Sequence, residues 1–589
     1  MRTTTVAWTS SRQQQNRVAA ALTNGNPGEV ATALAAAYVD LDATESFLAM
    51  DSVTQHGTTA VATFKATVNL AVGGHPWTYI GRFGLTMKNG AWLVDWAPGL
   101  INPSLGPGDR LAVVTAFAPR AVIEDSAGQP LLTKSADYHI GVYPGQLANA
   151  ARTADEFSDL TNLNPQQVLG QIRAAPPRGF LSLLTLDPAS FRSIWPKLAK
   201  VPGLHHERRA ERLFESAADE VVGSVETEDS KALRAEGAAY QPGATVGLSG
   251  LEQSFQNTLA GTPTTNVVVV DRAGRTLATL YTLLGHVGIP VRTTLVSRDQ
   301  AAAAAALAAQ PDSGEIVAVD APTGDILALA AREAGSVRLP AGGPMNAKLA
   351  PGMAFSIVSA AALLGIGETA KSPLPCENVA TIGGQTFTYH LGHAPSTTFA
   401  TDFATGCYTA FAKMSQNLTS AQLTAVEKAF GVGAQWNLRV QAFSGSAAAA
   451  ADEASLAQQV IGTGGVLMSP LGMAMVAAEV DAGTGRAPVL LASDPASTWQ
   501  APLSTDKLGA LRQLMREAVR SGAARGAKVA DVAGQPVYGQ AGVVRTGAHA
   551  WLSWFVGYRG GVAVAVIETG TTQAQAAASL AGAFLSKIR

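Results

Sequence analysis

Charged residues, cysteines and long apolar runs are all scarce in this chain of 589 residues. Only 15% of the residues are charged and the formal net charge is −2, so no nucleic-acid partner is predicted, because such a partner requires clustered Lys and Arg. No apolar run reaches the ~18 residues that a membrane-spanning helix needs. The first residues also lack the apolar segment of a signal peptide, which leaves two interpretations open: a natural soluble protein, or an extracytoplasmic region whose N-terminal anchor is not part of this sequence.

Sulfur ligands are equally few, since the chain has only Cys376 and Cys407. No Cys-x-x-Cys or Cys/His spacing accompanies them, so no metal site is predicted. No Gly-rich phosphate loop is present, and no cofactor is predicted. The two cysteines form a disulfide in an oxidising compartment or remain two buried thiols, and the sequence leaves both states open.

Apolar residues make up 47% of the chain, which is enough for several packed cores, and the length suggests three or four domains at ~100–200 residues each. Near the N-terminus, helical spacing at Glu29–Tyr38 precedes three alternating segments, which are predicted to be strands. These segments are Thr59–Leu70, Trp77–Lys88 and Trp92–Trp96. A helix followed by an antiparallel sheet predicts a small α+β domain.

The C-terminal half has the pattern of an α/β unit. Val317–Ala330 reads as two strands joined by a Pro-Thr-Gly turn, and Phe355–Leu364 reads as a helix. Trp551–Tyr558 and Val562–Glu568 alternate as closing strands, and Gln573–Leu585 is predicted to be the last helix.

The segment Pro-Gly-Met353-Ala-Phe355-Ser356-Ile-Val-Ser359-Ala-Ala-Ala-Leu is the most informative one. It resembles the Pro-Gly-Ser-x-Phe-Lys-Ile-Val segment that carries the nucleophile of penicillin-binding proteins. In that family the Ser attacks a peptide or β-lactam carbonyl, and the Lys one turn later helps to take its proton. The family has three catalytic motifs around one cleft, which are called stations here. At the first station, Met353 stands at the Ser position and Ser356 at the Lys position, so both catalytic groups are absent.

Further segments carry the same resemblance in the same order along the chain. Trp92–Pro103 resembles the exit of the nuclear-transport-factor-2-like domain of MecA-type members, and Ala118–Gly128 and Gly247–Pro263 resemble segments of the class B pedestal domain. Gly462–Val476 resembles a helix of the transpeptidase domain. The implied fold is multidomain α+β, with a nuclear-transport-factor-2-like domain, an extended pedestal or dimerisation domain, and a serine-transpeptidase/β-lactamase-like α/β domain. The expected boundaries are 1–100, 106–297 and 298–589.

Two more catalytic stations of the family are also altered. At the second station, Ser-x-Asn, the matching positions hold Gly406 and Tyr408. At the third station, Lys-Thr-Gly, they hold Gln540, Ala541 and Gly542, of which only the Gly is kept. A literal Arg545-Thr-Gly follows and is interpreted as a turn.

Substitute groups are few. Ser356 and Ser359 are the alternative nucleophiles, although helical geometry turns Ser359 about 120° away from the Met353 face. Neither has a base beside it in sequence, and His390 and His393 could approach only from a loop.

Three other motifs receive structural interpretations. Ser504 of a literal Ser-x-x-Lys507 is predicted to be a helix N-cap, and the literal Ser415-Gln416-Asn417 is predicted to consist of solvent-face or loop residues. The adjacent His205 and His206 are predicted to lie on a charged helix face, where they would point about 100° apart and not share a metal ion.

The leading hypothesis is a catalytically inactive penicillin-binding-protein-like protein that acts as a scaffold or regulator of cell-wall assembly. The alternatives are an active D,D-transpeptidase or carboxypeptidase with an unorthodox serine, and a binder of stem peptide or β-lactam without turnover. The resemblance implies a place on the extracytoplasmic face of the bacterial cytoplasmic membrane. It implies cell-wall synthesis proteins as partners, with a membrane glycan polymerase and peptidoglycan as candidates.

Overall fold

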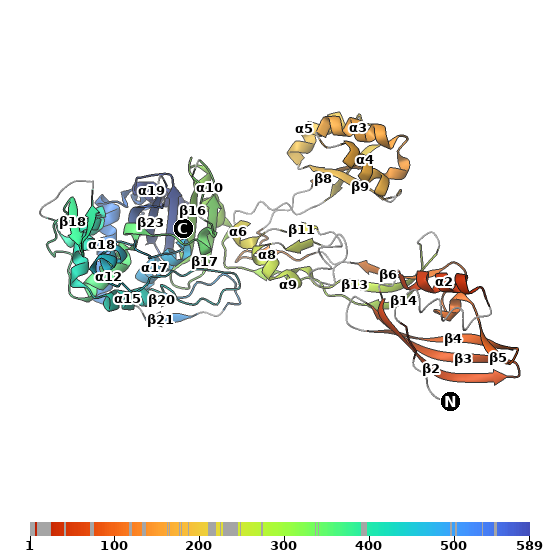
Figure 1. The fold of residues 1–589 in the computed structure, drawn as a ribbon. Helices are drawn as coiled ribbons and strands as arrows, with labels where there is room; N and C mark the ends of the chain where they lie inside the picture. Colours follow the sequence, from red (N-terminus) through yellow and green to blue (C-terminus); the bar gives the residue numbers. More distant parts are fainter. Residues whose placement is uncertain are drawn as a thin grey trace. The chain divides into compact units, whose positions relative to one another are not determined.

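A computed structural model gives the fold of the chain (Figure 1). It describes residues 6–8, 25–39, 43–70, 76–116, 120–131, 137–161, 163, 165–175, 177, 179–186, 188–209, 219–223, 225–227, 245–247, 249–271, 275–335, 337–339, 341–389, 397–494, 497–500, 504–532, 534–546 and 550–588. The chain divides into two compact units, the first formed by residues 1–121, 225–247 and 255–290, and the second by 122–224, 248–254 and 291–589. Within the described residues, no helix has both the length and the apolar content to span a membrane.

The first unit is built on an antiparallel sheet in the order β1-β2-β3-β4-β5 and on a second sheet in the order β14-β13-β6. Its elements are β1 Val6–Trp8, α2 Pro27–Val39, β2 Ala43–His56, β3 Thr59–Leu70, β4 Trp77–Lys88, β5 Ala91–Asp95, η1 Pro98–Leu100, β6 Arg110–Ala116, β11 Val225–Thr227, β12 Thr245–Gly247, α9 Gln256–Ala260, β13 Thr264–Val270 and β14 Thr276–Leu283. Buried positions recur at every second residue of β3, as alternation predicts. Val68, Trp77, Leu111, Val267 and Val269 form one core that includes residues of both sheets.

Residues 137–209 of the second unit form a small α+β lobe. Its three-stranded sheet, in the order β10-β8-β9, carries the helices around a core that includes Ile140, Phe157 and Leu198. The elements in and around it are β7 Ile123–Glu124, β8 Asp137–Val142, η2 Pro144–Gln146, α3 Ala150–Thr161, α4 Pro165–Ala174, β9 Leu181–Leu186, α5 Pro188–Leu198, β10 Leu204–Arg209, α6 Asp219–Val222 and α8 Gly250–Ser254.

The C-terminal part of the second unit is built on a five-stranded antiparallel sheet in the order β17-β16-β24-β23-β22. Every residue of β24 is buried, so both faces of the sheet are covered at its centre. Helices α10 and α19 contact each other and the sheet, while α17 contacts β16, β23 and β24 (Figure 1). Strand β22 ends the sheet, and its neighbours outside the sheet include η3 and α18.

The bounds of this part are as follows. They are β15 Val291–Arg292, α10 Ser297–Ala308, β16 Gly314–Asp320, β17 Ile326–Arg332, α11 Gly343–Asn346, η3 Gly352–Phe355, α12 Ser356–Gly365, β18 Val379–Ile382, β19 Gln385–Thr388, α13 Phe399–Thr405, α14 Tyr408–Met414, η4 Ser415–Asn417, α15 Ser420–Ala429, α16 Glu453–Val460, α17 Pro470–Ala482, β20 Thr484–Arg486, β21 Thr498–Gln500, α18 Thr505–Ser521, η5 Arg525–Ala530, β22 Tyr538–Arg545, β23 Trp551–Arg559, β24 Val562–Thr569 and α19 Gln575–Leu585.

Most of the predicted elements are present. The helix expected at Glu29–Tyr38 is α2, and the strands expected at Thr59–Leu70 and Trp77–Lys88 are β3 and β4. The fourteen-residue strand β2, Ala43–His56, was not predicted. Its alternation is broken by register shifts against β3, which obscure a period of two in the sequence.

Candidate functional site

The first and third stations lie directly against each other. Met353, in η3, is only 5% exposed, and Ser356, which begins α12, is fully buried. A Cβ atom on Gly542 of β22 would stand 2.7 Å from the backbone nitrogen of Ala354 and 2.9 Å from that of Met353. Only a glycine therefore allows β22 to approach η3 this closely.

The side chain of Gln540 forms hydrogen bonds inside the contact between β22 and the first station. It is fully buried, and its Nε2 donates to Ser356 Oγ at 3.1 Å and to the carbonyl of Phe403 at 2.6 Å. Its Oε1 accepts the backbone N–H of Ala541 at 2.9 Å. One neutral amide thus joins the first station, the third station and the helix that leads into the second station, and all of its contacts are satisfied inside the protein.

The second station lies at the junction of α13 and α14. Gly406 ends α13 in the left-handed conformation, with φ of 73°, which favours glycine. Tyr408 begins α14 and packs edge-on against Tyr389, with ring centroids 5.3 Å apart. Burial raises the pKa of Tyr408 above its ordinary value. The ring is half-buried, and it offers neither the hydroxymethyl nor the carboxamide group of a Ser-x-Asn station.

Among the described residues, neither alternative nucleophile has a base as a hydrogen-bond partner. Ser359 is fully buried and donates to the carbonyl of Val460 at 2.6 Å. Ser356 accepts from the Gln540 amide, which cannot take a proton. A serine hydroxyl without a general base is a poor nucleophile. His390 and His393 lie outside the described residues.

Cys376 and Cys407 form a disulfide. The sequence left open a disulfide or two free thiols, and the structure has the disulfide. A carboxylate oxygen of Asp402, on α13, and the two sulfur atoms all lie within 4.8 Å of one another. The Asp402 side chain is fully buried, and burial raises its pKa to about 7. Sequence reasoning missed Asp402, although an acidic residue inside the apolar helix Phe399–Thr405 was a detectable signal.

Two predictions made for other motifs are wrong in part. His205 and His206 lie on strand β10 rather than on a helix, where successive side chains point to opposite faces. Gln416 and Asn417 are exposed, as predicted, but Ser415 is only 2% exposed and its hydroxyl donates to the Ala412 carbonyl.

Two further predictions are partly correct. Ser504 occupies the N-cap position of α18, as predicted, but its side chain forms no capping hydrogen bond. Arg545 is the last residue of β22, paired with Trp551, rather than part of a turn.

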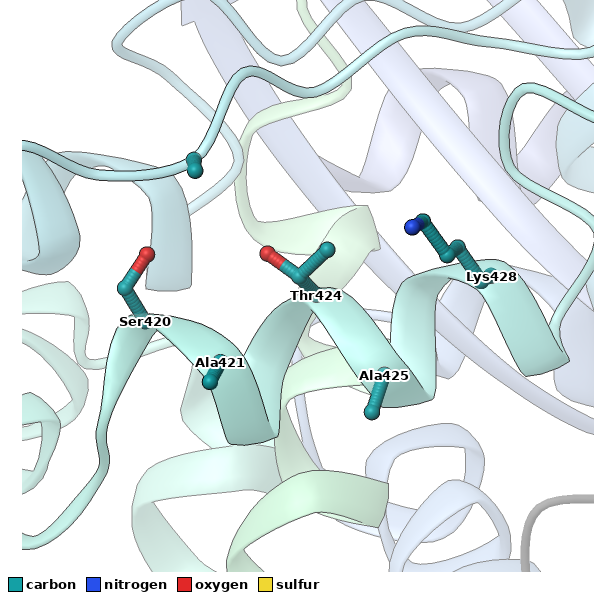
Figure 2. A pocket seen from close by; sticks show the side chains of 6 residues that line it. Ser420, Ala421, Thr424, Ala425 and Lys428 are labelled. Atoms are coloured by element: carbon teal, nitrogen blue, oxygen red, sulfur yellow. The ribbon is translucent and has the colours of Figure 1, made fainter.

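A shallow pocket of about 540 Å³ lies along α15, and none of the seven station positions lines it (Figure 2). Ser420, Thr424 and Lys428 point from one side of the helix into it. The hydroxyls of Ser420 and Thr424 have no hydrogen-bond partner among the described residues. Lys428 follows Ser420 by eight residues, about 12 Å along the helix axis, so the two cannot form a Ser–Lys catalytic pair.

Comparison with protein-family models matches three parts of the chain. A penicillin binding protein transpeptidase domain model matches residues 314–588, a penicillin-binding protein dimerisation domain model matches 115–293, and an NTF2-like N-terminal transpeptidase domain model matches 5–109. The matches support a three-domain architecture, with an NTF2-like N-terminal domain, a dimerisation or pedestal domain and a C-terminal domain similar to the penicillin-binding-protein transpeptidase domain. The three domains in this order are consistent with a class B penicillin-binding protein.

Two curated relatives are distant in sequence. The peptidoglycan D,D-transpeptidase FtsI of Escherichia coli strain K12 and that of Escherichia coli O157:H7 are each 24% identical to this chain over 252 residues. The match covers 41% of this chain and 40% of each relative, so the chain spans about two fifths of the length of these relatives.

Proposed function

We propose that this protein is a catalytically inactive member of the penicillin-binding-protein group that acts as a scaffold or regulator in peptidoglycan assembly. The observation that carries the proposal is the buried Gln540 amide, whose donors and acceptor are satisfied by Ser356, Phe403 and Ala541. Where the family uses a serine, a base and a lysine around a substrate, this chain has a closed network of neutral groups.

Acyl transfer needs a nucleophile and a base in contact with each other. The thioether of Met353 is not a usable acyl nucleophile, and its side chain is 5% exposed. The Ser356 hydroxyl accepts a hydrogen bond from an amide rather than giving its proton to a base. Both observations support the absence of turnover.

Peptide binding without turnover is also disfavoured. A stem peptide that adds as a strand to β22 needs free backbone groups along that strand. The N–H of Ala541 is already bonded to Gln540 Oε1, and no lysine stands at position 540 to attract a terminal carboxylate. This argument favours a scaffold over a binder of stem peptide or β-lactam.

The proposed setting is supported by the domain order and by the activity for which the relatives are named. FtsI is a peptidoglycan D,D-transpeptidase, and we place this chain in the same process on the extracytoplasmic face of the cytoplasmic membrane. Its proposed partners are cell-wall synthesis proteins, with a membrane glycan polymerase as the first candidate and peptidoglycan itself as the second. The Cys376–Cys407 disulfide agrees with an oxidising compartment.

Intact-protein mass spectrometry after incubation with excess penicillin G and a panel of other β-lactams tests the proposal. The expected result is no mass shift under conditions that fully acylate an active transpeptidase measured in parallel. The double variant Met353→Ser, Ser356→Lys rebuilds only the first station, and it is expected to remain unlabelled because the second and third stations are still altered.

A stoichiometric adduct on the unaltered chain is the contrary outcome. If that adduct disappears in Ser356→Ala or in Ser359→Ala, the protein is an enzyme with a relocated serine. A proportionate loss of both label and thermal stability in the same variant would instead indicate unfolding, so the melting temperature of each variant is measured alongside.

A further inference from the structure

The disulfide beside the second station has a buried carboxyl group within 4.8 Å of its sulfur atoms. Asp402 is fully buried, its Oδ1 has no hydrogen-bond partner among the described residues, and a carboxylate oxygen lies within 4.8 Å of both Cys376 Sγ and Cys407 Sγ. A buried, incompletely bonded carboxyl group costs stability, so its retention beside two sulfur atoms points to a chemical role.

The groups around Asp402 supply few hydrogens. Thr397 Oγ1 lies 3.2 Å from Asp402 Oδ2, but its single hydroxyl hydrogen has a second acceptor in the Leu374 carbonyl. Thr409 Oγ1 donates to the Glu377 carbonyl at 2.6 Å and contacts Cys407 Sγ at 3.3 Å. If both threonines donate to carbonyls, they can only accept from Asp402 and from a reduced Cys407. Burial raises the pKa of Asp402 to about 7 even though the hydrogen bond with Thr397 lowers it, so the carboxyl group can hold a proton near neutral pH.

We propose that Cys376, Cys407 and Asp402 form a redox-active thiol–disulfide site in which Asp402 is the proton donor and acceptor. The co-reactant is a dithiol, either a small molecule or a protein. This site is independent of the proposed scaffold function, because it needs neither Ser356 nor Gln540.

The reduction proceeds in two displacements. A thiolate of the dithiol attacks Cys376 Sγ, which is the more exposed of the two half-cystines at 4% against 0%. The disulfide bond breaks, and Cys407 Sγ leaves with the electron pair and takes the proton of Asp402. The second thiolate of the dithiol then attacks its own mixed disulfide and releases Cys376, which is protonated from water. The dithiol is oxidised to a disulfide and the protein gains two thiols.

The disulfide is also a mechanical connection. It ties Cys376, just before β18, to Cys407, the N-cap residue of α14, and Lys413 of α14 forms an ion pair of 3.2 Å with Glu377. Asp402 itself lies on α13, next to Phe403, whose carbonyl accepts from Gln540. Reduction would release one of the connections that hold the second station, and it is expected to lower the melting temperature.

The experiment measures reduction of the native full-length protein by dithiothreitol between pH 5.5 and 8.5, with alkylation and mass spectrometry at each time point. Rates are divided by the concentration of reductant thiolate, which removes the titration of dithiothreitol itself. The wild-type rate is expected to fall as the pH rises through about 7, because Asp402 loses its proton. At pH 6, Asp402→Asn should be reduced at least about tenfold more slowly and should lose this pH dependence.

Other titrating groups do not reproduce that profile. Burial raises the phenol pKa of Tyr389 and of Tyr408 above the ordinary value of 10.0, so both stay neutral in this range. The Glu377–Lys413 ion pair lies beside the site, and the variant Glu377→Gln tests how much this pair contributes to the pH dependence of the reduction rate. Glu427→Gln is the matched control, since burial also raises the pKa of Glu427 to about 7 while its hydrogen-bond partner is Gln459.

Two outcomes would overturn the proposal. One is a wild-type rate, corrected for thiolate, that does not change with pH, which needs no variant to observe. The other is a reduction rate that equals the global unfolding rate at every pH. The unfolding rate is measured separately by rapid dilution into denaturant, under conditions where unfolding is reversible. The disulfide would then be a closed structural bond, and Asp402 would have no part in its chemistry.

Discussion

Two edge strands of this molecule differ in how far other residues of the chain cover them. They are β22 in the C-terminal domain and β14 in the first unit. Five of the eight residues of β22 are buried, and η3 and α18 contact the strand. The first four residues of β14 are exposed, with Leu277 55% exposed, and its pairing with β13 has two register shifts. One edge is thus covered by the chain itself, whereas the other is bare and is protected from pairing by bulges.

The difference teaches that a sheet edge at the position matched by the family's Lys-Thr-Gly motif is not by itself a binding site. A peptide that added to β22 as a further strand would need its free edge, yet the Gln540 amide and η3 occupy that side. The same kind of substitution should therefore be costly on β22 and harmless on β14.

Gln540→Lys is expected to have the largest effect. The substitution rebuilds the family residue, but it places an ammonium group in a fully buried position whose contacts are a hydroxyl and a carbonyl. An unpaired buried charge should lower the free energy of unfolding by about 3–5 kcal/mol. Chemical denaturation measures it, with Gln513→Lys on the exposed face of α18 as the neutral control. Unchanged stability together with β-lactam labelling would show that the edge is open.

Gly542→Ala tests the close approach of β22 to η3. The new Cβ atom would meet backbone nitrogens at 2.7 and 2.9 Å, so the strand or η3 must shift, at a cost of about 1–3 kcal/mol. Gly509→Ala, in α18, meets nothing within 4 Å and should instead stabilise the helix by up to about 1 kcal/mol. Equal effects of the two substitutions on the melting temperature would contradict the tight contact.

The ion pairs that precede the two strands give a pH-dependent comparison. Arg516 and Asp531 bond bidentately, and Asp531 also accepts the N–H of Val537, just before β22. Partial burial alone would raise the pKa of Asp531, but the bonds from Arg516 and Val537 outweigh it and hold the pKa below 3.8. Before β14, Arg275 pairs with Asp271 but is 80% exposed.

Asp531→Asn should therefore cost about 1–2 kcal/mol of unfolding free energy at pH 7, and Arg275→Gln less than about 1 kcal/mol. Because the folded-state pKa of Asp531 is lowered, its contribution is fully present above pH 3.8 and disappears as the pH falls through the folded-state value. Unfolding curves at pH 7 and near pH 3 check both the size and the sign. A difference that grows on acidification would contradict the assigned pKa shift.

Ala278→Lys on β14 is expected to have the smallest effect. The side chain is exposed, so the free energy of unfolding should stay within about 0.5 kcal/mol of the wild-type value. The matched substitution Ala541→Lys on β22, at a residue 1% exposed, should behave like Gln540→Lys. If Ala278→Lys is as damaging as Ala541→Lys, then β14 is covered in solution by a partner.

The sequence predicted the elements that form the sheet and the stations, because strand alternation and turn residues are local signals. It identified seven positions of the altered stations, of which only Gly542 keeps the family residue: Met353, Ser356, Gly406, Tyr408, Gln540, Ala541 and Gly542. The structure brings the first and third stations together. It could not predict the hydrogen bonds of Gln540, which join residues 137 and 184 positions apart in the chain. Nor could it choose between a disulfide and two thiols, since that choice depends on the distance between Cys376 and Cys407 in the folded chain.

The Gln540 amide has a consequence for antibiotic pharmacology. A drug that inhibits by mimicking an acyl donor needs an accessible serine. A site filled by the protein's own side chain has no serine that the drug could acylate. Under this proposal the protein neither consumes β-lactam molecules nor is switched off by them, at any dose. Its contribution to wall assembly would persist in treated cells, and compounds against it would have to act on its contacts with other proteins.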